Sequence, residues 1–144
     1  MKADLHNHSY YSDGVLSPSE VVRLASKAGC DLFSLTDHDT TDGIAEAKLE
    51  ADKVGLNLIN GVEISAFWRN MAIHIVGLGV DVNNDILQTG LKHNKELRKI
   101  RAEKIALSLW RSGIKDALEK AQIISGGHML TRTHFAQMLI QEGY

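Results

Sequence analysis

Two histidines near the start of the chain are the first residues whose spacing suggests chemistry. His6 and His8 stand one residue apart, and on a β-strand the side chains at i and i+2 point to the same side. Their imidazoles can therefore converge on one ion from a single rigid element. Alone, such a pair is a modest indication, because a histidine is more often a hydrogen-bonded core residue.

Further potential metal ligands follow the pair along the chain. Each falls at or near the end of a predicted strand, and the carboxyl ends of neighbouring parallel strands meet at one edge of a sheet. Several nitrogen and oxygen ligands at one edge would be costly to bury without an ion. We therefore predict a divalent metal site built from six side chains: His6, His8, Asp13, His38, Glu63 and His74.

The elements that must position these residues can be placed from the apolar periodicity. Strands are predicted at residues 3–7, 32–35, 57–63 and 72–78, so that Glu63 ends the third strand. A helix begins with Pro18 behind a Ser17 capping box and ends at Gly29. A second helix covers residues 44–54 and is capped from residues 40–42. Strand, helix, strand, helix, strand at this spacing predicts an α/β fold with a parallel sheet or barrel.

The residue pattern of the chain changes after Asp81. Only helical periodicity follows, with breaks at Gly113 and at Gly126-Gly127. We therefore divide the chain into residues 1–82, which contain the predicted parallel sheet or barrel, and residues 83–144, a helical insertion or cap. Residues 92–101 are basic and are expected to lie in solvent. Residues 102–110 are apolar on most of their circumference and are expected to pack.

The composition sets limits on the partners. The chain has 144 residues, 44% of them hydrophobic, which suits one globular domain, and a net charge of −2. No global basic field recruits double-stranded DNA. The single cysteine, Cys30, can form no internal disulfide. No apolar run approaches the roughly 20 residues that span a bilayer, so we expect a cytoplasmic protein without a membrane partner. The oligomeric state is left open.

Four ordered motifs resemble those of the polymerase and histidinol phosphatase (PHP) superfamily. The motifs are Asp4-Leu5-His6-Asn7-His8 with Ser12-Asp13-Gly14, Thr36-Asp37-His38-Asp39-Thr40, Gly61-Val62-Glu63-Ile64-Ser65 and Ile73-His74-Ile75-Val76-Gly77. The segment Thr131-Arg132-Thr133-His134 is similar to the branch of nucleotide phosphoesterases that includes ribonuclease AM, or 3',5'-nucleotide bisphosphate phosphatase.

The resemblance implies the first part of a distorted seven-stranded barrel that holds up to three divalent ions, with a helical insertion as a cap. His6, His8 and Glu63 would hold one ion, Asp13 and His38 a second, and Glu63 with His74 a third. Asp37 and Asp39 would orient His38, which is a common role for carboxylates near a metal. The donor set suits manganese, zinc or iron, and the sequence does not choose among them.

The implied activity is hydrolysis of nucleotide phosphate esters by a metal-bound hydroxide, with His38 and Glu63 as the catalytic residues. The substrate would be a 3',5'-bisphosphate nucleotide or the 5' end of a short RNA. Arg132 is the candidate phosphate clamp, because a guanidinium matches phosphate geometry. His134 is a second candidate substrate ligand, with bracing of the insertion as its alternative role.

The chain departs from the family pattern in its last third. It contains no His-Pro-Gly motif, and no Asp-x-His motif follows His38. These two motifs complete the three ions in the family, so we expect this chain to be the front part of a longer protein, with an incomplete ligand set and no activity alone. The alternatives are a histidinol-phosphatase-like enzyme and an inactive PHP module with a structural role.

Overall fold

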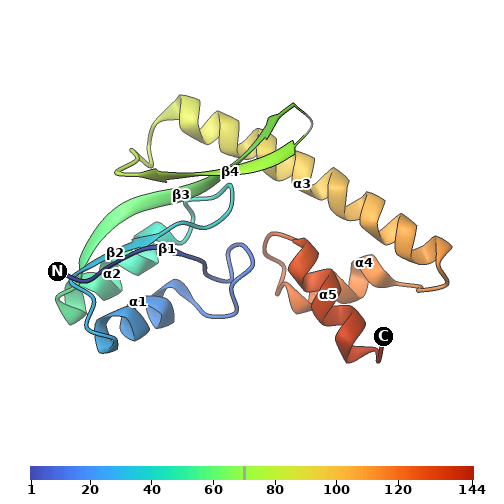
Figure 1. Cartoon of the computed structure of the whole chain (residues 1–144), viewed down its shortest axis with the longest axis horizontal. Coiled ribbons are helices and arrows are strands. Elements are labelled where there is room, and N and C mark those ends of the chain that lie inside the picture. The colour runs from blue at the N-terminus through green and yellow to red at the C-terminus, as the bar shows by residue number, and fades with distance from the viewer. Residues whose placement is uncertain (70) are drawn as a thin grey trace.

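The structure, a computed structural model, describes residues 1–69 and 71–144. Its elements in chain order are β1 (Ala3–Asn7), α1 (Pro18–Lys27), β2 (Leu32–Leu35), α2 (Ile44–Val54), β3 (Asn57–Trp68), β4 (Met71–Leu78), α3 (Asp85–Arg111), α4 (Ala117–Ile124) and α5 (Arg132–Gln141). A curled sheet and two helices form one end of the molecule, and α4 with α5 forms the other (Figure 1). The predicted α/β class and the order of its elements are confirmed.

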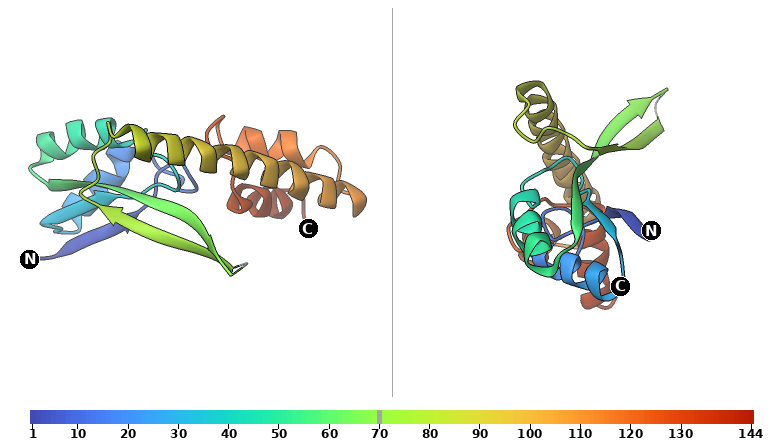
Figure 2. Two further views of the ribbon diagram at one scale, coloured as in Figure 1. Left: turned by 90° about the horizontal axis from the view of Figure 1, so that it is seen from above. Right: turned by 90° about the vertical axis from the view of Figure 1, so that its left-hand side faces the viewer.

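The sheet has the order β1-β2-β3-β4. β1, β2 and β3 pair in parallel, as the two intervening helices require. β4 pairs antiparallel to β3, from Gly61 opposite Leu78 to Trp68 opposite Met71. Two views in Figure 2 show these two strands extending as a twisted ribbon beyond the rest of the sheet. The predicted end of β3 at Glu63 is wrong, because pairing with β4 prolongs the strand to Trp68 and leaves Glu63 in its middle.

The two helices behind the sheet begin in different ways. α1 has the predicted capping box, in which Ser17 and Glu20 satisfy each other's backbone N–H groups. α2 begins after Gly43 without a side-chain cap, which corrects the predicted cap at residues 40–42. The hydroxyl of Thr40 accepts a hydrogen bond from the backbone N–H of Asp42 instead, so it stabilises the turn before the helix.

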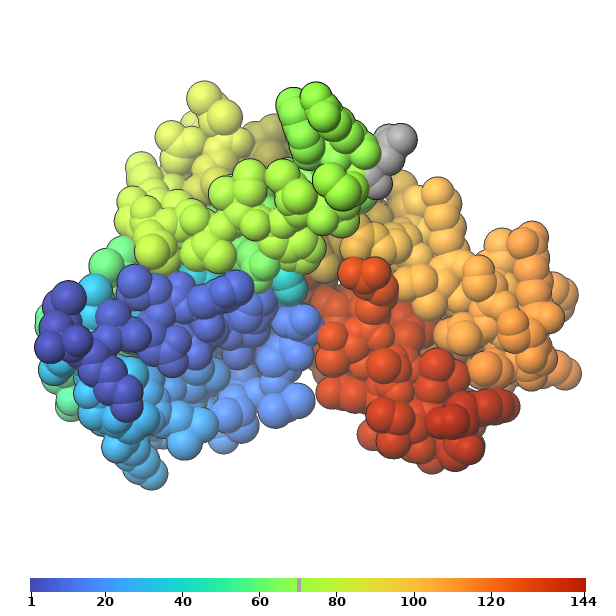
Figure 3. Space-filling model, in the orientation of Figure 1, coloured from blue at the N-terminus to red at the C-terminus, as the bar shows by residue number. Residues whose placement is uncertain are grey.

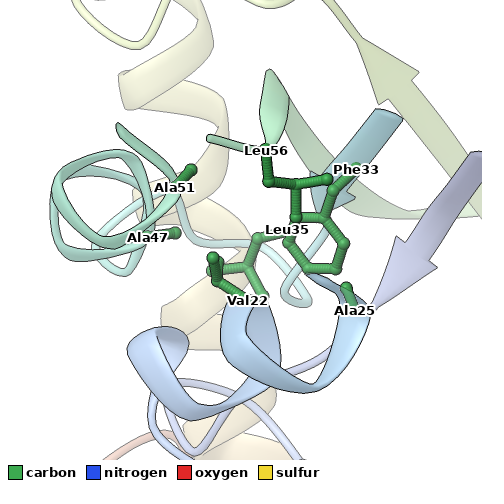
Figure 4. Packing of buried hydrophobic residues seen from close by; sticks show 7 residues of the cluster. All are labelled: Val22, Ala25, Phe33, Leu35, Ala47, Ala51 and Leu56. Carbon is green, nitrogen blue, oxygen red and sulfur yellow. The ribbon is translucent and has the colours of Figure 1, made fainter. Parts of the chain in front are cut away.

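The core of this end lies between the sheet and the two helices. Phe33 and Leu35 of β2 are essentially inaccessible. Figure 4 shows them surrounded by five further residues: Val22, Ala25, Ala47, Ala51 and Leu56. Truncating a fully buried phenylalanine to alanine typically costs about 3–5 kcal/mol. This core fixes β2, and through β2 it fixes the loop that follows, where His38 lies.

A second, separate core joins the three later helices. It contains Ala102 of α3, Ala117 and Ala121 of α4, and Phe135 and Met138 of α5. The predicted breaks at Gly113 and Gly126-Gly127 are confirmed, since they fall between these helices. Figure 3 shows the loop after β1 (blue) beside the last part of the chain, which contains α5 (red). The rings of Tyr10 and His128 stack across this boundary, with centroids 4.6 Å apart.

The β4 strand is exposed along most of its length, including the apolar residues Ile73 and Ile75.

None of the described helices is both long and apolar enough to cross a membrane.

Candidate metal centre

Glu63 is the centre of the candidate site. Its carboxylate is nearly buried and lies 2.9 Å from the Nε2 atom of His6 and 3.0 Å from that of His8. The same oxygen, Oε2, lies 3.5 Å from the Nδ1 atom of His38, and the other oxygen, Oε1, lies 3.0 Å from the Nδ1 atom of His74. One carboxylate of β3 is therefore shared by imidazoles from β1, β4 and the loops that follow β1 and β2.

The backbone holds Glu63 and His38 in this relation. The N–H of Glu63 donates to the carbonyl of Asp37 at 3.2 Å, and the N–H of Asp39 donates to the carbonyl of Glu63 at 2.9 Å. These two bonds form a parallel bridge between His38 and Glu63. His38 is thus placed by an extension of the β2–β3 pairing beyond the end of β2.

Asp13 completes the cluster from the loop after β1. Its Oδ1 lies 3.0 Å from the Nδ1 atom of His8, and its Oδ2 lies 3.7 Å from the Nε2 atom of His38. The loop passes so close to its own start that a Cβ atom on Gly14 would overlap the carbonyl of His8. Glycine after Asp13 therefore permits the close approach that brings the carboxylate to the two imidazoles.

The structure brings all six predicted metal ligands together. They form three overlapping groups, and within each group one ligand atom per residue lies within 4.8 Å of the others. The groups are His6, His8 and Glu63; His8, Asp13 and His38; and His38, Glu63 and His74. The resemblance implied nearly the same three groups. The structure adds His8 to the group of Asp13 and His38, and it adds His38 to the group of Glu63 and His74.

The protonation states favour a cation. The hydrogen bond from His8 lowers the pKa of Asp13 to about 2, with burial opposing and the charge of His38 assisting the shift. Burial and the nearby charge of Arg98 lower the pKa of His38 to about 4. Near neutral pH the carboxylate is ionised and the imidazole is neutral, which are the forms that bind metals.

The pKa values of His8 and Glu63, two further members of the cluster, result from opposing effects. Burial opposes protonation of His8, but the hydrogen bond and charge of Asp13 outweigh it and raise the pKa. Burial raises the pKa of Glu63, but the bond from His6 and the neighbouring imidazoles lower it overall. A proton on His8 thus supplies the neighbouring carboxylates with the positive charge that a bound cation would supply.

The donor set fits a divalent metal. It consists of imidazole nitrogens and carboxylate oxygens, which suit ions such as zinc, manganese or iron. Among the described residues, the buried Nδ1 atom of His38 has no hydrogen-bond partner, and an unpaired buried nitrogen is costly. A cation would satisfy it, so this site supports divalent metal binding.

The predicted role of Asp37 and Asp39 as supports of the His38 imidazole is wrong. Asp37 accepts hydrogen bonds from the backbone and hydroxyl of Ser9, at 2.7 and 2.6 Å, and from the hydroxyl of Ser12 at 2.6 Å. It thereby organises the loop that contains Asp13. Both carboxylates flank His38 in the chain, and neighbouring side chains of an extended segment point to opposite sides.

Asp39 instead anchors α3 to the sheet. Its carboxylate accepts hydrogen bonds from the backbone and hydroxyl of Ser65, from Asn94 at 2.8 Å and from Arg98 at 2.5 Å. Arg98 is therefore buried, although residues 92–101 were predicted to be solvated. The sequence does contain a signal for this arginine, because it lies seven residues after the buried Leu91 and four before the buried Ala102.

A small cavity of about 100 Å³ adjoins the cluster. Arg132, the predicted phosphate clamp, lines it together with Arg98 and Arg101 from α3. His134 has a different place, because its Nδ1 accepts the backbone N–H of Thr131 at 3.1 Å and so caps α5. This contact agrees with the bracing role that the sequence left open, and a substrate-binding role for His134 stays a prediction.

The comparisons with known proteins agree with this geometry. Residues 4–129 match the family described as PHP domain. The chain is 45% identical over 142 residues to a 5'-3' exoribonuclease of Haemophilus influenzae, covering 99% of this chain and 52% of that protein. It is 43% identical over 141 residues to a 3',5'-nucleoside bisphosphate phosphatase of Chromobacterium violaceum, covering 97% and 50%.

A solved structure has the same fold. An amidohydrolase from Chromobacterium violaceum, with bound sulfate and no metal, superposes with a TM-score of 0.92 at 41% identity, covering 99% of this chain and 51% of that chain. The chain thus spans about half the length of the curated relatives it matches. Its curled four-stranded sheet is a half-barrel of the predicted type. From the matched residues and this fold, we conclude that the chain belongs to the family of PHP domains.

Proposed function

We propose that the protein is a metal-dependent phosphoesterase, or the front part of one, that hydrolyses phosphate esters of nucleotides. The observation on which this rests is the carboxylate of Glu63 shared by four imidazoles, with Asp13 at hydrogen-bonding distance from one of them. Clustered nitrogen and oxygen donors of this kind suit divalent ions used in phosphoryl chemistry. Residues 1–82 would form the metal-binding half-barrel and residues 83–144 the helical cap.

We assign the six clustered side chains as the metal ligands: His6, His8, Asp13, His38, Glu63 and His74. Manganese, zinc or iron would fit, with up to three ions in a complete domain. Bound ions would supply an activated water and neutralise charge on the phosphoryl group. We assign His38 and Glu63 as the catalytic residues of the cluster: each, like His8, belongs to two of the three ligand groups, and a backbone bridge joins these two residues directly.

The protein's own residues would orient the substrate. Arg132 lines the cavity next to the cluster, where its guanidinium can bind two phosphate oxygens. The names of the two curated relatives support a 3',5'-bisphosphate nucleotide or the 5' end of a short RNA as the substrate. The sulfate bound in the solved relative supports a site for a tetrahedral anion. A cytoplasmic location stays a prediction.

The direct test is phosphate release from adenosine 3',5'-bisphosphate in the presence of Mn²⁺, with histidinol phosphate as the competing substrate. We expect release from the nucleotide, and loss of at least about 100-fold in rate for Glu63→Gln, since it removes a charge shared by the metal ligands. Glu103→Gln, on the exposed surface of α3, is the matched control. Preference for histidinol phosphate would assign the other branch. Stoichiometric Mn²⁺ binding without release from either ester, by a protein that also contains the His-Pro-Gly and Asp-x-His motifs, would identify an inert module.

A further inference from the structure

The strand β4 forms one edge of the sheet, and this edge is unprotected. β4 stands last in the strand order, and among the residues that the structure describes no strand pairs with its outer side. Seven of its eight residues are exposed. Its sequence, MAIHIVGL, contains no lysine, arginine, aspartate, glutamate or proline. Such residues are among the means by which proteins prevent an edge strand from pairing with another chain.

The opposite edge of the sheet is different. β1 has only five residues, and Asp4 and His6 are among them. A short strand with charged side chains is poorly suited to edge-to-edge pairing. Only one of the two edges therefore favours a further strand. An assembly built on β4 alone closes after one addition, whereas two receptive edges would allow open-ended growth.

Apolar side chains continue from this edge over one face of the ribbon that β3 and β4 form. Ile73 and Ile75 are 39% and 52% exposed, and Trp68 and Met71 are 59% and 60% exposed. Met71 lies opposite Trp68, and Ile73 lies opposite Ala66, so these side chains share one face. Figure 2 shows the ribbon projecting away from the helices. Contiguous exposed apolar surface of this kind marks interaction sites in soluble proteins.

The charges that flank β4 are complementary to those of a second copy. Two identical edges pair through a two-fold axis that runs across the strands, and this axis makes the strands antiparallel. Arg69 and Asp81 both lie six positions from Ile75. With the axis at Ile75, Arg69 of each copy therefore lies next to Asp81 of the other. Both side chains are exposed, and within the described residues neither has an ion-pair partner.

We propose that two copies of this chain associate through β4, as an antiparallel pair of edge strands that joins the two four-stranded sheets. The pairing satisfies the N–H and C=O groups along the free edge of each copy. It also covers Ile73 and Ile75 with the same strand of the other copy. His74, a candidate metal ligand, belongs to this strand, so the dimer restrains one side of the cluster. The association itself requires no metal and goes beyond the proposed function.

The test is sedimentation equilibrium of the full chain over a range of protein concentrations, with a chelator present. We expect twice the monomer mass for the wild type. Ile75→Lys should raise the dissociation constant at least about tenfold, because it places two like charges opposite each other at the axis. Ile140→Lys makes the same change at a position of α5 that is 73% exposed, and it should leave the dissociation constant unchanged.

Charge reversal tests the register and the direction of the strands. Arg69→Glu should weaken association by about two- to tenfold, because it turns two attractive pairs into repulsive ones. Adding Asp81→Arg to this variant should restore the association. Loss of association without this recovery would overturn the register. Circular dichroism and urea unfolding report the fold of each variant.

Hydrogen exchange locates the contact. The backbone amides of β4 that point away from β3 should exchange more slowly at high protein concentration, and Ile75→Lys should abolish this difference. A monomer at every concentration would overturn the proposal and assign the edge to a different chain. Species that grow beyond two copies, or a dimer unaffected by Ile75→Lys, would overturn it as well. Because neither metal nor substrate is present, the outcome is independent of Mn²⁺-dependent hydrolysis.

Discussion

At the scale of single residues, the side chains next to the metal ligands have roles in the scaffold as well as in the chemistry. Asp39 follows His38 directly, yet its carboxylate is turned toward Ser65 and Arg98. Its backbone has a positive φ of 51°, a conformation that is uncommon outside glycine, asparagine and aspartate. This conformation lets one residue point at α3 while its neighbour points at the cluster.

Asp39 should make the stability of the protein depend on pH. Burial raises its pKa, but hydrogen bonds from Ser65 and from Arg98 outweigh burial and lower it below the ordinary value of 3.8. The carboxylate therefore stabilises the fold above the pKa of the unfolded state, and this contribution is lost as the pH falls through the folded pKa. We expect the free energy of unfolding of Asp39→Asn to fall less between pH 5 and about pH 3 than that of the wild type.

Urea unfolding with a chelator present measures this difference. Asp52→Asn, on the exposed face of α2, is the control and should follow the wild-type curve. A constant gap between the wild type and Asp39→Asn at all pH values would contradict the expectation.

At the scale of elements, α3 links the two cores of the molecule. Its C-terminal half packs on α4 and α5 through Ala102, while Asn94 and Arg98 in its N-terminal half bind the loop after β2 and the strand β3. α3 is therefore attached to the sheet by buried polar contacts. The geometry of the cavity between them depends on this attachment.

Removing the buried arginine should loosen this attachment. Arg98→Met leaves Asp39 buried without its cation, and breaking a buried pair on one side typically costs about 3–5 kcal/mol. We expect the double variant with Asp39→Asn to lose less stability than the sum of the two single variants, as measured by urea unfolding. Lys95→Met breaks the exposed pair with Asp42, at 2.7 Å, and should cost no more than about 1 kcal/mol.

Additive losses for Arg98→Met and Asp39→Asn would show that the two side chains do not act as a pair. If Lys95→Met lost as much stability as Arg98→Met, burial would not explain the difference expected between the two ion pairs.

At the scale of the whole molecule, a cation should hold together parts of the chain that are far apart in sequence. The six candidate ligands come from β1, the two loops that follow β1 and β2, β3 and β4. A metal that binds only the folded arrangement stabilises it by mass action, by about 2.7 kcal/mol at a concentration 100 times the dissociation constant.

We therefore expect Mn²⁺ to raise the Tm of the protein and a chelator to reverse the rise. The rise should be larger at pH 7.5 than at pH 5.5, because protons compete for the imidazoles and the pKa of His8 is raised. Mg²⁺ is the control ion, since it prefers oxygen ligands and should raise the Tm less. An equal rise with Mg²⁺, or a rise independent of pH, would indicate binding to surface carboxylates instead.

The sequence by itself determined the elements and the identity of the clustered residues. Apolar periodicity and the Ser17 capping box located the strands and helices, because such signals are local. The spacing of His6 and His8 indicated one shared side of a strand, and the ordered motifs indicated the family. The predicted set of six ligands did not require any knowledge of distances.

Only the tertiary structure decided which partners the polar residues contact. Pairing with the antiparallel β4 extends β3, so Glu63 lies in the middle of that strand. Because α3 packs across this region, Asp39 binds Arg98 and does not support His38. The same packing places Arg101 and Arg132, 31 positions apart along the chain, in the lining of one cavity. Such pairings join residues far apart in the chain, so they depend on how the elements pack and not on the local pattern that forms them.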